Sequence, residues 1–448
     1  MKKTDYWNTY RALKFHNSET EKFMLEPFGT VASNFITDSD AFINLAVGSI
    51  RSGKTIAAII TFLRFIQESP HSRFAMAGKT LGSLTRNVLD PMKGILRYYN
   101  ISYDHRKFDK ELDLIIGGRK KTIVLYGIEK RGADEPIRGS TYAGCLLDEV
   151  TVMDDEGVRM MISRNSLPGS KIFMTCNPTN PNNFIHQEYV CNENGIKAGE
   201  IKVTNFLLED NQSLSSEYIR HVKSIYPEDS VFYKRNIQGM WVSGQGLIFD
   251  SFNTNNIFSG EVDLDYYDYL EIGSDYGTST TTCYSLVGIN EFDDHNEFDV
   301  ICESGHDATR LNCSQTDVER VHDIIRLQDE YHLDDCNMFY PSHDAGSLKA
   351  ALEKTPEFIM DLQTFTPNTL ECIQEMSSLF YQNYLRIHES CTETIQQLHG
   401  YEWDSKAAQR GEDKPVKKDD HYIDSMRAPI MNHLYGMDNQ LLGGLIYL

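Results

Sequence analysis

The sequence predicts an α/β protein of two units: a parallel sheet with helices on both faces, followed by a mixed sheet. Three observations support this prediction. A glycine-rich loop at residues 48–55 separates an apolar strand from an apolar helical pattern. Short apolar strands and helical segments then alternate through the first half, which is typical of a parallel sheet. From residue 269 the pattern changes to three successive strands, then a helix and a fourth strand.

Length and composition fit a globular protein with more than one core. The chain has 448 residues, of which 40% are hydrophobic and 24% charged. Nine cysteines without a C-x-x-C pair argue against a disulfide framework or a zinc site. We expect no secretory signal and no membrane span, since no suitable apolar run is present. A net charge of −22 argues against passive coating of nucleic acid, but it does not exclude an enzyme that grips DNA through local basic patches.

The glycine-rich loop reads G-x-x-x-x-G-K-T between its strand and its helix, the context in which this motif forms a phosphate-binding loop, or P-loop. Gly48 and Gly53 let backbone N–H groups turn toward phosphates, Lys54 reaches the β- and γ-phosphates, and the hydroxyl of Thr55 ligates Mg²⁺. Arg51 is either a surface arginine or a contact to the γ-phosphate. The loop residues predicted to bind nucleotide are Gly48, Ser49, Ile50, Arg51, Ser52, Gly53, Lys54 and Thr55.

Two further strands of the first half end in polar residues. The run 143–147 ends in Asp148, predicted to hold Mg²⁺ through water, and Glu149, predicted to polarise the attacking water. The next strand ends in T-C-N-P, where Thr175 and Asn177 either sense the γ-phosphate or form a plain strand-to-loop turn. The sequence therefore predicts a P-loop ATPase of the ASCE type, in which a catalytic glutamate follows a neighbouring strand.

Acidic residues mark the second unit. Asp275 lies in its first strand, where an unpaired charge is costly to bury, so a metal ion is the expected partner. Asp344 follows the fourth strand. Asp420 and His421 precede Asp424 by four and three residues at the start of the last clear helix, which places the three on one face. Asp420 is either a metal ligand or a simple N-cap, and the neighbouring Asp419 is expected to be a solvated cap.

A β-β-β-α-β order with acids on strand one, after strand four and on a late helix is that of RNase H-like nucleases. Their reaction uses two divalent ions about 4 Å apart, bridged by carboxylates. Hard oxygen ligands of this kind suit Mg²⁺ or Mn²⁺. The basic stretch 406–418 is either a solvated loop or a mobile hairpin that contacts the DNA backbone and gates the site. Residues 213–241 predict a short helical subdomain, and the apolar tail 436–448 is either a docking peptide or a strand.

The arginine inside the P-loop, L-L-D-E at 146–149 and T-C-N-P at 175–178 together resemble the ATPase of the large terminase subunits of tailed bacteriophages. These proteins are motors that cut concatemeric DNA and pump it into procapsids. The segment 236–252 is similar to the boundary between motor and nuclease in that family, and the D-D-H-Y-I-D motif at 419–424 is also of the family type. The resemblance covers almost the whole chain.

The resemblance implies a role for several residues. Arg51 and Lys54 would act on the phosphates, Glu149 would be the catalytic glutamate, and Arg138 would reach the ATP site of a neighbouring subunit in a ring. His421 matches a position that is histidine in some relatives and acidic in others. The nuclease metals would be held by Asp275, Asp344 and Asp424, with His421 and Asp420 as further ligands. No adenine-recognition motif is clear, although Tyr10 and the other aromatics at 6–10 are candidates for stacking on the base.

The resemblance also implies partners and a location. The cofactors would be ATP with Mg²⁺ at the first site and two Mg²⁺ or Mn²⁺ at the second. The partners would be double-stranded DNA, a portal protein and a small terminase subunit, with a ring of subunits forming on the portal and no membrane involved. The protein would act in the host cytoplasm and transiently on the procapsid portal, and it would be absent from the mature virion.

The predicted organisation is an ATPase domain at 1–205, a helical linker subdomain at 206–245 and a nuclease domain at 246–448. The leading hypothesis is a large terminase subunit that translocates and cuts DNA. The alternative is a P-loop translocase or helicase whose RNase H-like domain binds DNA without cutting it. A third hypothesis, a DNA scaffold without turnover, is disfavoured by the intact Lys54, Asp148 and Glu149.

Overall fold

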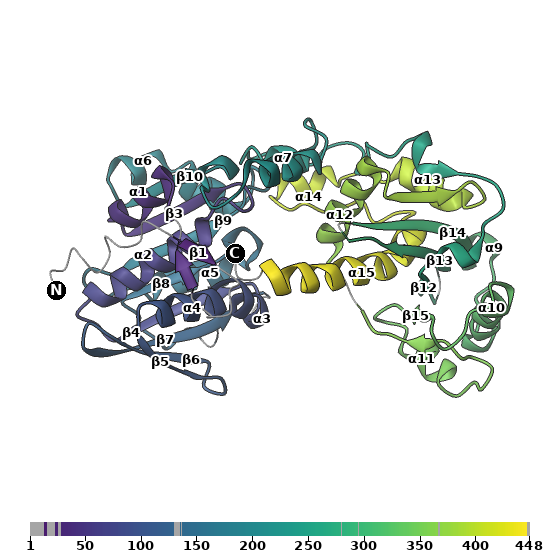
Figure 1. The fold of residues 1–448 in the computed structure, drawn as a ribbon, viewed down its shortest axis with the longest axis horizontal. Helices are drawn as coiled ribbons and strands as arrows, with labels where there is room; N and C mark the ends of the chain where they lie inside the picture. The colour runs from purple at the N-terminus through teal and green to yellow at the C-terminus, as the bar shows by residue number, and fades with distance from the viewer. Residues whose placement is uncertain are drawn as a thin grey trace.

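The structure is a computed structural model that describes residues 13–15, 23–25, 28–129, 135, 137–278, 280–293, 295–365 and 368–445. Its two halves each contain their own sheet (Figure 1). A separate two-stranded sheet joins β1 (Leu13–Phe15) to β2 (Phe23–Leu25). The aromatics at 6–10, proposed to stack on a base, lie outside the described residues.

The N-terminal sheet is parallel across six strands, as predicted. Its order is β10-β3-β9-β8-β4-β7-β6-β5, and the last two strands are added antiparallel at one edge. This antiparallel edge was not predicted from the sequence. The strands are β3 (Ile43–Gly48), β4 (Arg73–Gly78), β5 (Ser102–Arg106), β6 (Glu111–Ile116), β7 (Arg119–Gly127), β8 (Gly144–Leu147), β9 (Lys171–Cys176) and β10 (Ile201–Phe206).

Helices cover both faces of this sheet, because its central strands β3, β4, β8 and β9 are buried on both sides and need a partner on each. One face packs on α1, α2 and α4, and the other on α5. The helices are α1 (Thr30–Asp38), α2 (Lys54–Glu68), α3 (Leu81–Leu84), α4 (Asp90–Tyr98), α5 (Asp155–Ser163) and α6 (Glu193–Lys197), with a π-helical turn at Thr85–Leu89 between α3 and α4.

The C-terminal sheet is mixed and confirms the predicted β-β-β-α-β order. Its strand order is β11-β17-β14-β13-β12-β15-β16, with β12, β13 and β14 antiparallel and the other neighbours parallel. The strands are β11 (Ile257–Phe258), β12 (Tyr269–Asp275), β13 (Thr281–Glu291), β14 (Asn296–Asp307), β15 (Met338–Tyr340), β16 (Asp361–Leu362) and β17 (Leu385–His388). The helices of this half are α9 (Ala308–Leu311), α10 (Asp317–Glu330), α11 (Gly346–Leu352), α12 (Thr369–Gln382), α13 (Thr392–Gly400), α14 (Ser405–Gln409) and α15 (His421–Leu445).

Helix α15 packs across β12 and β13. Gly273 of β12 allows this close approach, since a Cβ there would lie 1.9 Å from the backbone oxygen of Ser425. The described part of the tail, 436–445, continues α15 and is not a strand. Among the described residues, no helix has the length and apolar character to cross a membrane.

Between the two sheets, α7 (Ser216–Ser224) and α8 (Val231–Asn236) form the predicted helical segment. Their buried side chains and those of the turn between them, among them Tyr226 and Phe232, join one hydrophobic cluster with Phe249, Phe380 and Trp403 of the C-terminal half. The helical segment therefore shares a core with the second sheet.

The basic stretch forms a hairpin, residues 402–416. An antiparallel bridge pairs Trp403 with Pro415, and the amide of Asp404 donates to the carbonyl oxygen of Lys414 at 2.8 Å. Of the two alternatives for the stretch 406–418, a hairpin is the conformation present up to residue 416; its mobility and its contact with DNA remain predictions.

Candidate functional site

The glycine-rich loop joins β3 to α2. A Cβ at Gly48 would lie 1.8 Å from the carbonyl oxygen of Phe206, so only glycine fits there. Gly53 (φ +85°) and Arg51 (φ 53°) both have left-handed backbone conformations, which is unusual for an arginine. The carbonyl oxygen of Arg51 accepts a 2.7 Å hydrogen bond from Nδ2 of Asn211. These contacts therefore fix the conformation of the loop backbone.

Lys54 lies buried beneath this loop. Its Nζ donates to the carbonyl oxygen of Gly48 at 3.1 Å and to Oγ of Ser52 at 3.2 Å. Burial lowers the pKa of Lys54 to about 8. The Oγ of Ser49 is also buried and has no hydrogen-bond partner among the described residues. An ammonium group and an unpaired hydroxyl in an N–H-rich loop fit the phosphates of a nucleotide.

The acidic pair follows β8, close to the loop. Oδ1 of Asp148 accepts hydrogen bonds from Oγ1 of Thr175 at 2.6 Å and of Thr55 at 3.2 Å. Burial raises the pKa of Asp148. Burial, together with the charge of Asp148, also raises the pKa of Glu149 to about 7. The paired oxygens of Thr55 and Asp148 are hard ligands that fit Mg²⁺.

The other residues predicted for the ATP site, Asn177, Arg138 and Arg51, are less buried than Lys54 and Asp148. Asn177 is half-buried, and its carbonyl oxygen accepts from Oγ1 of Thr151 at 3.2 Å. Arg138 is exposed in the turn before β8. Arg51 is exposed at the apex of the loop.

A second cluster lies where β12 ends and α15 begins. Nδ1 of His421 and Oδ2 of Asp275 are hydrogen-bonded at 2.7 Å, and this bond raises the pKa of His421. Burial raises the pKa of Asp424 to about 6; the charges of Asp420 and Asp275 add to this effect, and those of Arg427 and Lys417 oppose it. Carboxylates raise one another's pKa only when they lie close together, so Asp275, Asp420 and Asp424 form one cluster.

Asp420 does not act as a side-chain N-cap in this cluster. Its side chain is buried, and its Oδ2 has no hydrogen-bond partner among the described residues. The amide of Tyr422, in the first turn of α15, donates instead to Oε1 of Gln397 at 2.8 Å. Nζ of Lys417 lies 3.9 Å from Oδ2 of Asp420. A buried carboxylate oxygen without a hydrogen-bond partner, among other acids, fits a divalent cation.

Asp344 and Asp419 do not join this cluster. Asp344 is exposed two residues beyond Ser342, whose Oγ donates to the carbonyl oxygen of Ser274 at 2.9 Å. Parallel pairing of β15 with β12 thus brings Asp344 to the same sheet edge as Asp275. Asp419 is exposed, with φ 51°.

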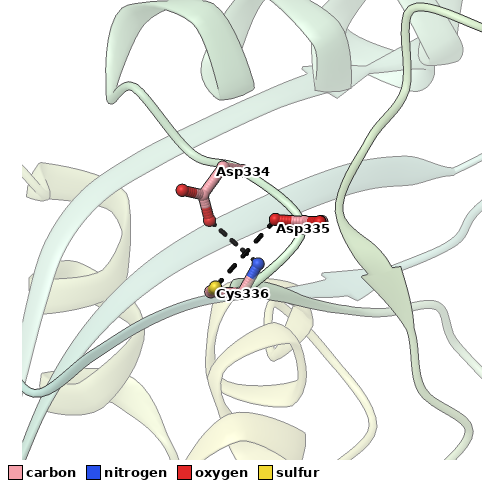
Figure 2. A group of neighbouring side chains, drawn as sticks. All are labelled: Asp334, Asp335 and Cys336. Carbon is pink, nitrogen blue, oxygen red and sulfur yellow. Dashed lines mark hydrogen bonds between the residues drawn. The ribbon is translucent and has the colours of Figure 1, made fainter.

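Within the described part of the chain, only Asp334, Asp335 and Cys336 have three potential metal-ligand atoms within 4.8 Å of one another. Figure 2 shows that these are consecutive residues of one turn. The amide of Cys336 donates to Oδ1 of Asp334 at 2.8 Å, which is ordinary turn chemistry. All three are exposed, so this group does not indicate a metal site.

Two residues near the sites, Lys79 and Arg427, were not predicted from the sequence, and Lys417 was predicted only as part of the basic stretch 406–418. Lys79 follows β4, and its charge opposes the raised pKa of Glu149. Arg427 is buried; it pairs with Asp424 through Nη1 and donates from Nη2 to the hydroxyl of Tyr401 at 2.8 Å. Lys417 lies 3.7 Å from Asp424. Asp424 and Arg427 are three residues apart on a helix, and this spacing is a sequence signal that could have revealed their ion pair.

The fold and the two sites define a P-loop ATPase joined to an RNase H-like domain. A family model described as the N-terminal part of the T4-like-virus-type large terminase subunit matches residues 45–256. A structure of the large terminase from a thermophilic bacteriophage is 27% identical to this chain, with a TM-score of 0.83, and the match covers 91% of this chain and 100% of that one. The complexes of that phage terminase with ADP and with ATP-gamma-S are each 27% identical, with TM-scores of 0.80 and 0.79 and coverage of 90% of this chain and 98% of theirs. No curated protein matches the chain. The chain is thus similar to large terminase subunits of bacteriophages, over residues 45–256 by the family model and over most of its length by the structural match.

Proposed function

We propose that the chain hydrolyses ATP to move double-stranded DNA into procapsids and cuts concatemeric DNA with divalent metal ions. The main observation in support of ATP hydrolysis is that the P-loop and the acidic pair Asp148 and Glu149 lie side by side at one edge of the sheet. Oγ1 of Thr55 donates to Asp148, and the amide of Glu149 donates to Oγ1 of Thr175 at 3.2 Å. The ADP and ATP-gamma-S complexes of the similar terminase from the thermophilic phage further support ATP as the ligand.

In the ATPase site, Lys54 and the loop amides bind the β- and γ-phosphates, and Arg51 lies at the apex to contact the γ-phosphate. Thr55 and Asp148 would hold Mg²⁺, which would neutralise phosphate charge. Glu149 accepts a proton from the attacking water. A pKa near 7 suits this role, because a general base works best near the operating pH. Thr175 and Asn177 link the site to the loop beyond β9.

In the nuclease site, Asp275, Asp420 and Asp424 would hold the metal ions, and His421 would support Asp275. Asp344, exposed at the adjacent strand end and outside this cluster, would add a ligand only after the turn that follows β15 brings it closer. Two Mg²⁺ or Mn²⁺, when bound, supply Lewis acidity to the attacking water and the leaving 3′-oxygen. Arg427 fixes the orientation of Asp424 through its ion pair.

The proposed partners are double-stranded DNA, a portal protein and a small terminase subunit, with action in the host cytoplasm and on the procapsid portal. In a ring on the portal, Arg138 reaches the ATP site of the neighbouring subunit. Mixing Arg138→Ala with Glu149→Ala subunits should then restore some ATP hydrolysis at shared interfaces. Absence of rescue at every mixing ratio counts against this role.

The alternative, a translocase with a non-catalytic RNase H-like domain, is favoured by one observation: Asp275, Asp344 and Asp424 do not bring ligand atoms within 4.8 Å of one another. Asp275→Ala distinguishes the two functions. We expect it to abolish Mn²⁺-dependent plasmid cleavage and leave ATP hydrolysis intact; retained cleavage would remove the nuclease assignment.

Glu149→Ala should stop ATP turnover but keep nucleotide binding, and turnover at the wild-type rate contradicts the ATPase assignment.

A further inference from the structure

The turn that follows Asp275 is held by a buried arginine of α10. Arg320 is 3% exposed, and its Nη2 donates to the carbonyl oxygen of Gly277 at 2.9 Å. Its Nε donates to Oγ1 of Thr282 at 3.2 Å. That hydroxyl in turn donates to the same carbonyl oxygen at 2.8 Å and accepts from the amide of Gly277 at 3.2 Å. Both backbone groups of Gly277, close after Asp275 in the chain, are therefore fixed by side chains of α10 and β13.

The same arginine also holds the side chain of Tyr276, the residue directly after Asp275. The guanidinium carbon of Arg320 lies 4.7 Å from the centroid of the Tyr276 ring, within the range of a cation–π contact. Nη1 of Arg320 donates to Oδ1 of Asp317 at 3.0 Å, and the hydroxyl of Tyr276 donates to the same oxygen at 2.9 Å. The side chain of Tyr276 is thus held both at its ring face and at its hydroxyl.

Tyr276 connects this arrangement to the neighbouring strand end, that of β15. Its amide donates to Oγ of Ser342 at 2.8 Å, and its hydroxyl lies 3.1 Å from Oγ of Ser347 in α11. Ser342 also donates to the carbonyl oxygen of Ser274, the residue before Asp275. Helices α10 and α11 pack on each other and on β12 and β15 (Figure 1). The backbone on both sides of Asp275 is therefore fixed.

Helix α10 is held on the sheet by other side chains. Its buried Val321, Ile324 and Leu327 pack in one apolar cluster with side chains of β12 and β15. Burying a charged group is costly unless hydrogen bonds compensate it. For Arg320, these hydrogen bonds go to the turn after β12 and to one acid of its own helix. This placement indicates a role in fixing the position of Asp275 rather than in fixing the helix.

We propose that Arg320 is a positioning residue of the nuclease site, which holds the backbone of Asp275 so that its carboxylate is preorganised for a metal ion. This inference rests on the proposed function. Loss of a group that orients a metal ligand typically weakens metal binding by about 10–100-fold. Thr282 and Tyr276 are positioning residues in the same hydrogen-bond network, and all three act through Asp275.

The test is Mn²⁺ binding by the full chain without DNA or nucleotide, measured by electron paramagnetic resonance of the free ion. We expect Arg320→Lys, which keeps the charge but loses the planar fork of donors, to weaken Mn²⁺ binding at least about tenfold. Arg326→Lys on the same helix is the matched control, because the side chain of Arg326 is 64% exposed and pairs with Asp323. It should bind Mn²⁺ as the wild type does. Unchanged binding by Arg320→Lys would overturn the proposal.

A double variant separates positioning from a general loss of structure. Adding Arg320→Lys to Asp275→Ala should weaken Mn²⁺ binding no further, because Arg320 acts through Asp275. An equal loss in the wild-type and Asp275→Ala backgrounds overturns the proposal and leaves the proposed function intact. If Asp275→Ala binds Mn²⁺ as tightly as the wild type, the result counts instead against the proposed nuclease site.

Substitutions at Thr282 test the same network without changing a charge. Thr282→Val removes the hydroxyl that Arg320 and Gly277 share, and it should weaken Mn²⁺ binding. Thr282→Ser keeps the hydroxyl and should bind Mn²⁺ as the wild type does. This pair of variants decides the question even where Arg320→Lys fails to fold. Equal binding by the two variants overturns the proposal.

Discussion

At the residue scale, two adjacent aspartates show how burial distinguishes a metal ligand from a surface acid. Asp420 is 5% exposed and keeps an Oδ2 without a hydrogen-bond partner, whereas Asp419 is exposed with its own backbone in the left-handed region. A buried carboxylate oxygen without a hydrogen bond is unfavourable unless a cation compensates it, and the exposed Lys417 at 3.9 Å does so only in part. The pair is therefore a sensitive probe of the proposed nuclease site.

We predict that Asp420→Asn raises the Mn²⁺ concentration needed for half-maximal cleavage by about tenfold or more, because it removes a charged ligand. The measurement is a Mn²⁺ titration of plasmid cleavage. Asp419→Asn is the control, since asparagine tolerates the left-handed backbone, and it should titrate as the wild type. Equal titrations for both variants would show that Asp420 is not a ligand.

Residue positions were predictable where they depend on local sequence. The P-loop residues Gly48 and Lys54 are set by a short motif, and the structure places them as expected. The sequence left Asp420 open as a cap or a ligand, because it does not show that the distant Gln397 accepts from the amide of Tyr422. The exposure of Asp344 also depends on how the turn after β15 is oriented, which strand patterns do not encode.

At the element scale, α15 is held on the sheet by a buried histidine between two carboxylates. Nε2 of His433 lies 2.9 Å from Oε1 of Glu271, and Nδ1 lies 3.0 Å from Oε1 of Glu291. Burial alone would lower the pKa of His433, but the hydrogen bonds and charges of both glutamates outweigh it and raise the pKa above its usual value. Both ring nitrogens face carboxylates, so the imidazolium form is favoured in the folded state.

Because the pKa of His433 is raised in the folded state, its contribution to the free energy of unfolding is fully present below the unfolded-state pKa of about 6.5. This contribution is lost as the pH rises through the folded-state pKa. We predict that the wild type loses about 1–2 kcal/mol of unfolding free energy more than His433→Gln does between about pH 6 and pH 9. Thermal or urea unfolding at several pH values measures this difference. His322→Gln, at an exposed histidine of α10, should follow the wild-type pH curve. Parallel curves for wild type and His433→Gln would contradict the role of His433.

The contact of α15 with β12 makes a second prediction at this scale. Gly273→Ala places a Cβ 1.9 Å from the backbone oxygen of Ser425, next to Asp424, so the helix must shift at a cost of about 1–3 kcal/mol. We expect cleavage to fall at least about tenfold while ATP hydrolysis stays within about twofold of the wild type. Gly346→Ala has open space around its Cβ and serves as the control. Wild-type cleavage by Gly273→Ala would show that helix placement is not limiting.

At the scale of the whole molecule, strand and helix order was predictable, but the contacts between halves were not. Alternating apolar strands and helices indicate a parallel sheet, since each element carries its own periodicity. The antiparallel strands β5 and β6 contain charged residues such as Arg106 and Asp113, which pair with one another. These strands therefore lack the apolar runs from which the parallel strands were predicted. The ion pair of Arg235 with Asp413 spans 178 positions and leaves no local signal.

The helical linker subdomain at 206–245 and the nuclease domain at 246–448 remain predictions, and the shared core tests their boundary. A fragment that begins at residue 246 lacks the buried side chains of the helical segment and exposes Phe249 and Trp403 to water. Burial of one large apolar side chain is worth about 1.5–3 kcal/mol, so the loss of several should cost at least about 5 kcal/mol. The missing side chains are Leu208, Val222, Tyr226, Phe232, Tyr233 and Ile237. We predict that fragment 207–448 melts at least about 10 °C above fragment 246–448 in calorimetry, and that Mn²⁺-dependent cleavage survives better in the longer one. Equal melting temperatures would mean that the second sheet folds without the helical segment and that the boundary at residue 245 is a true domain boundary.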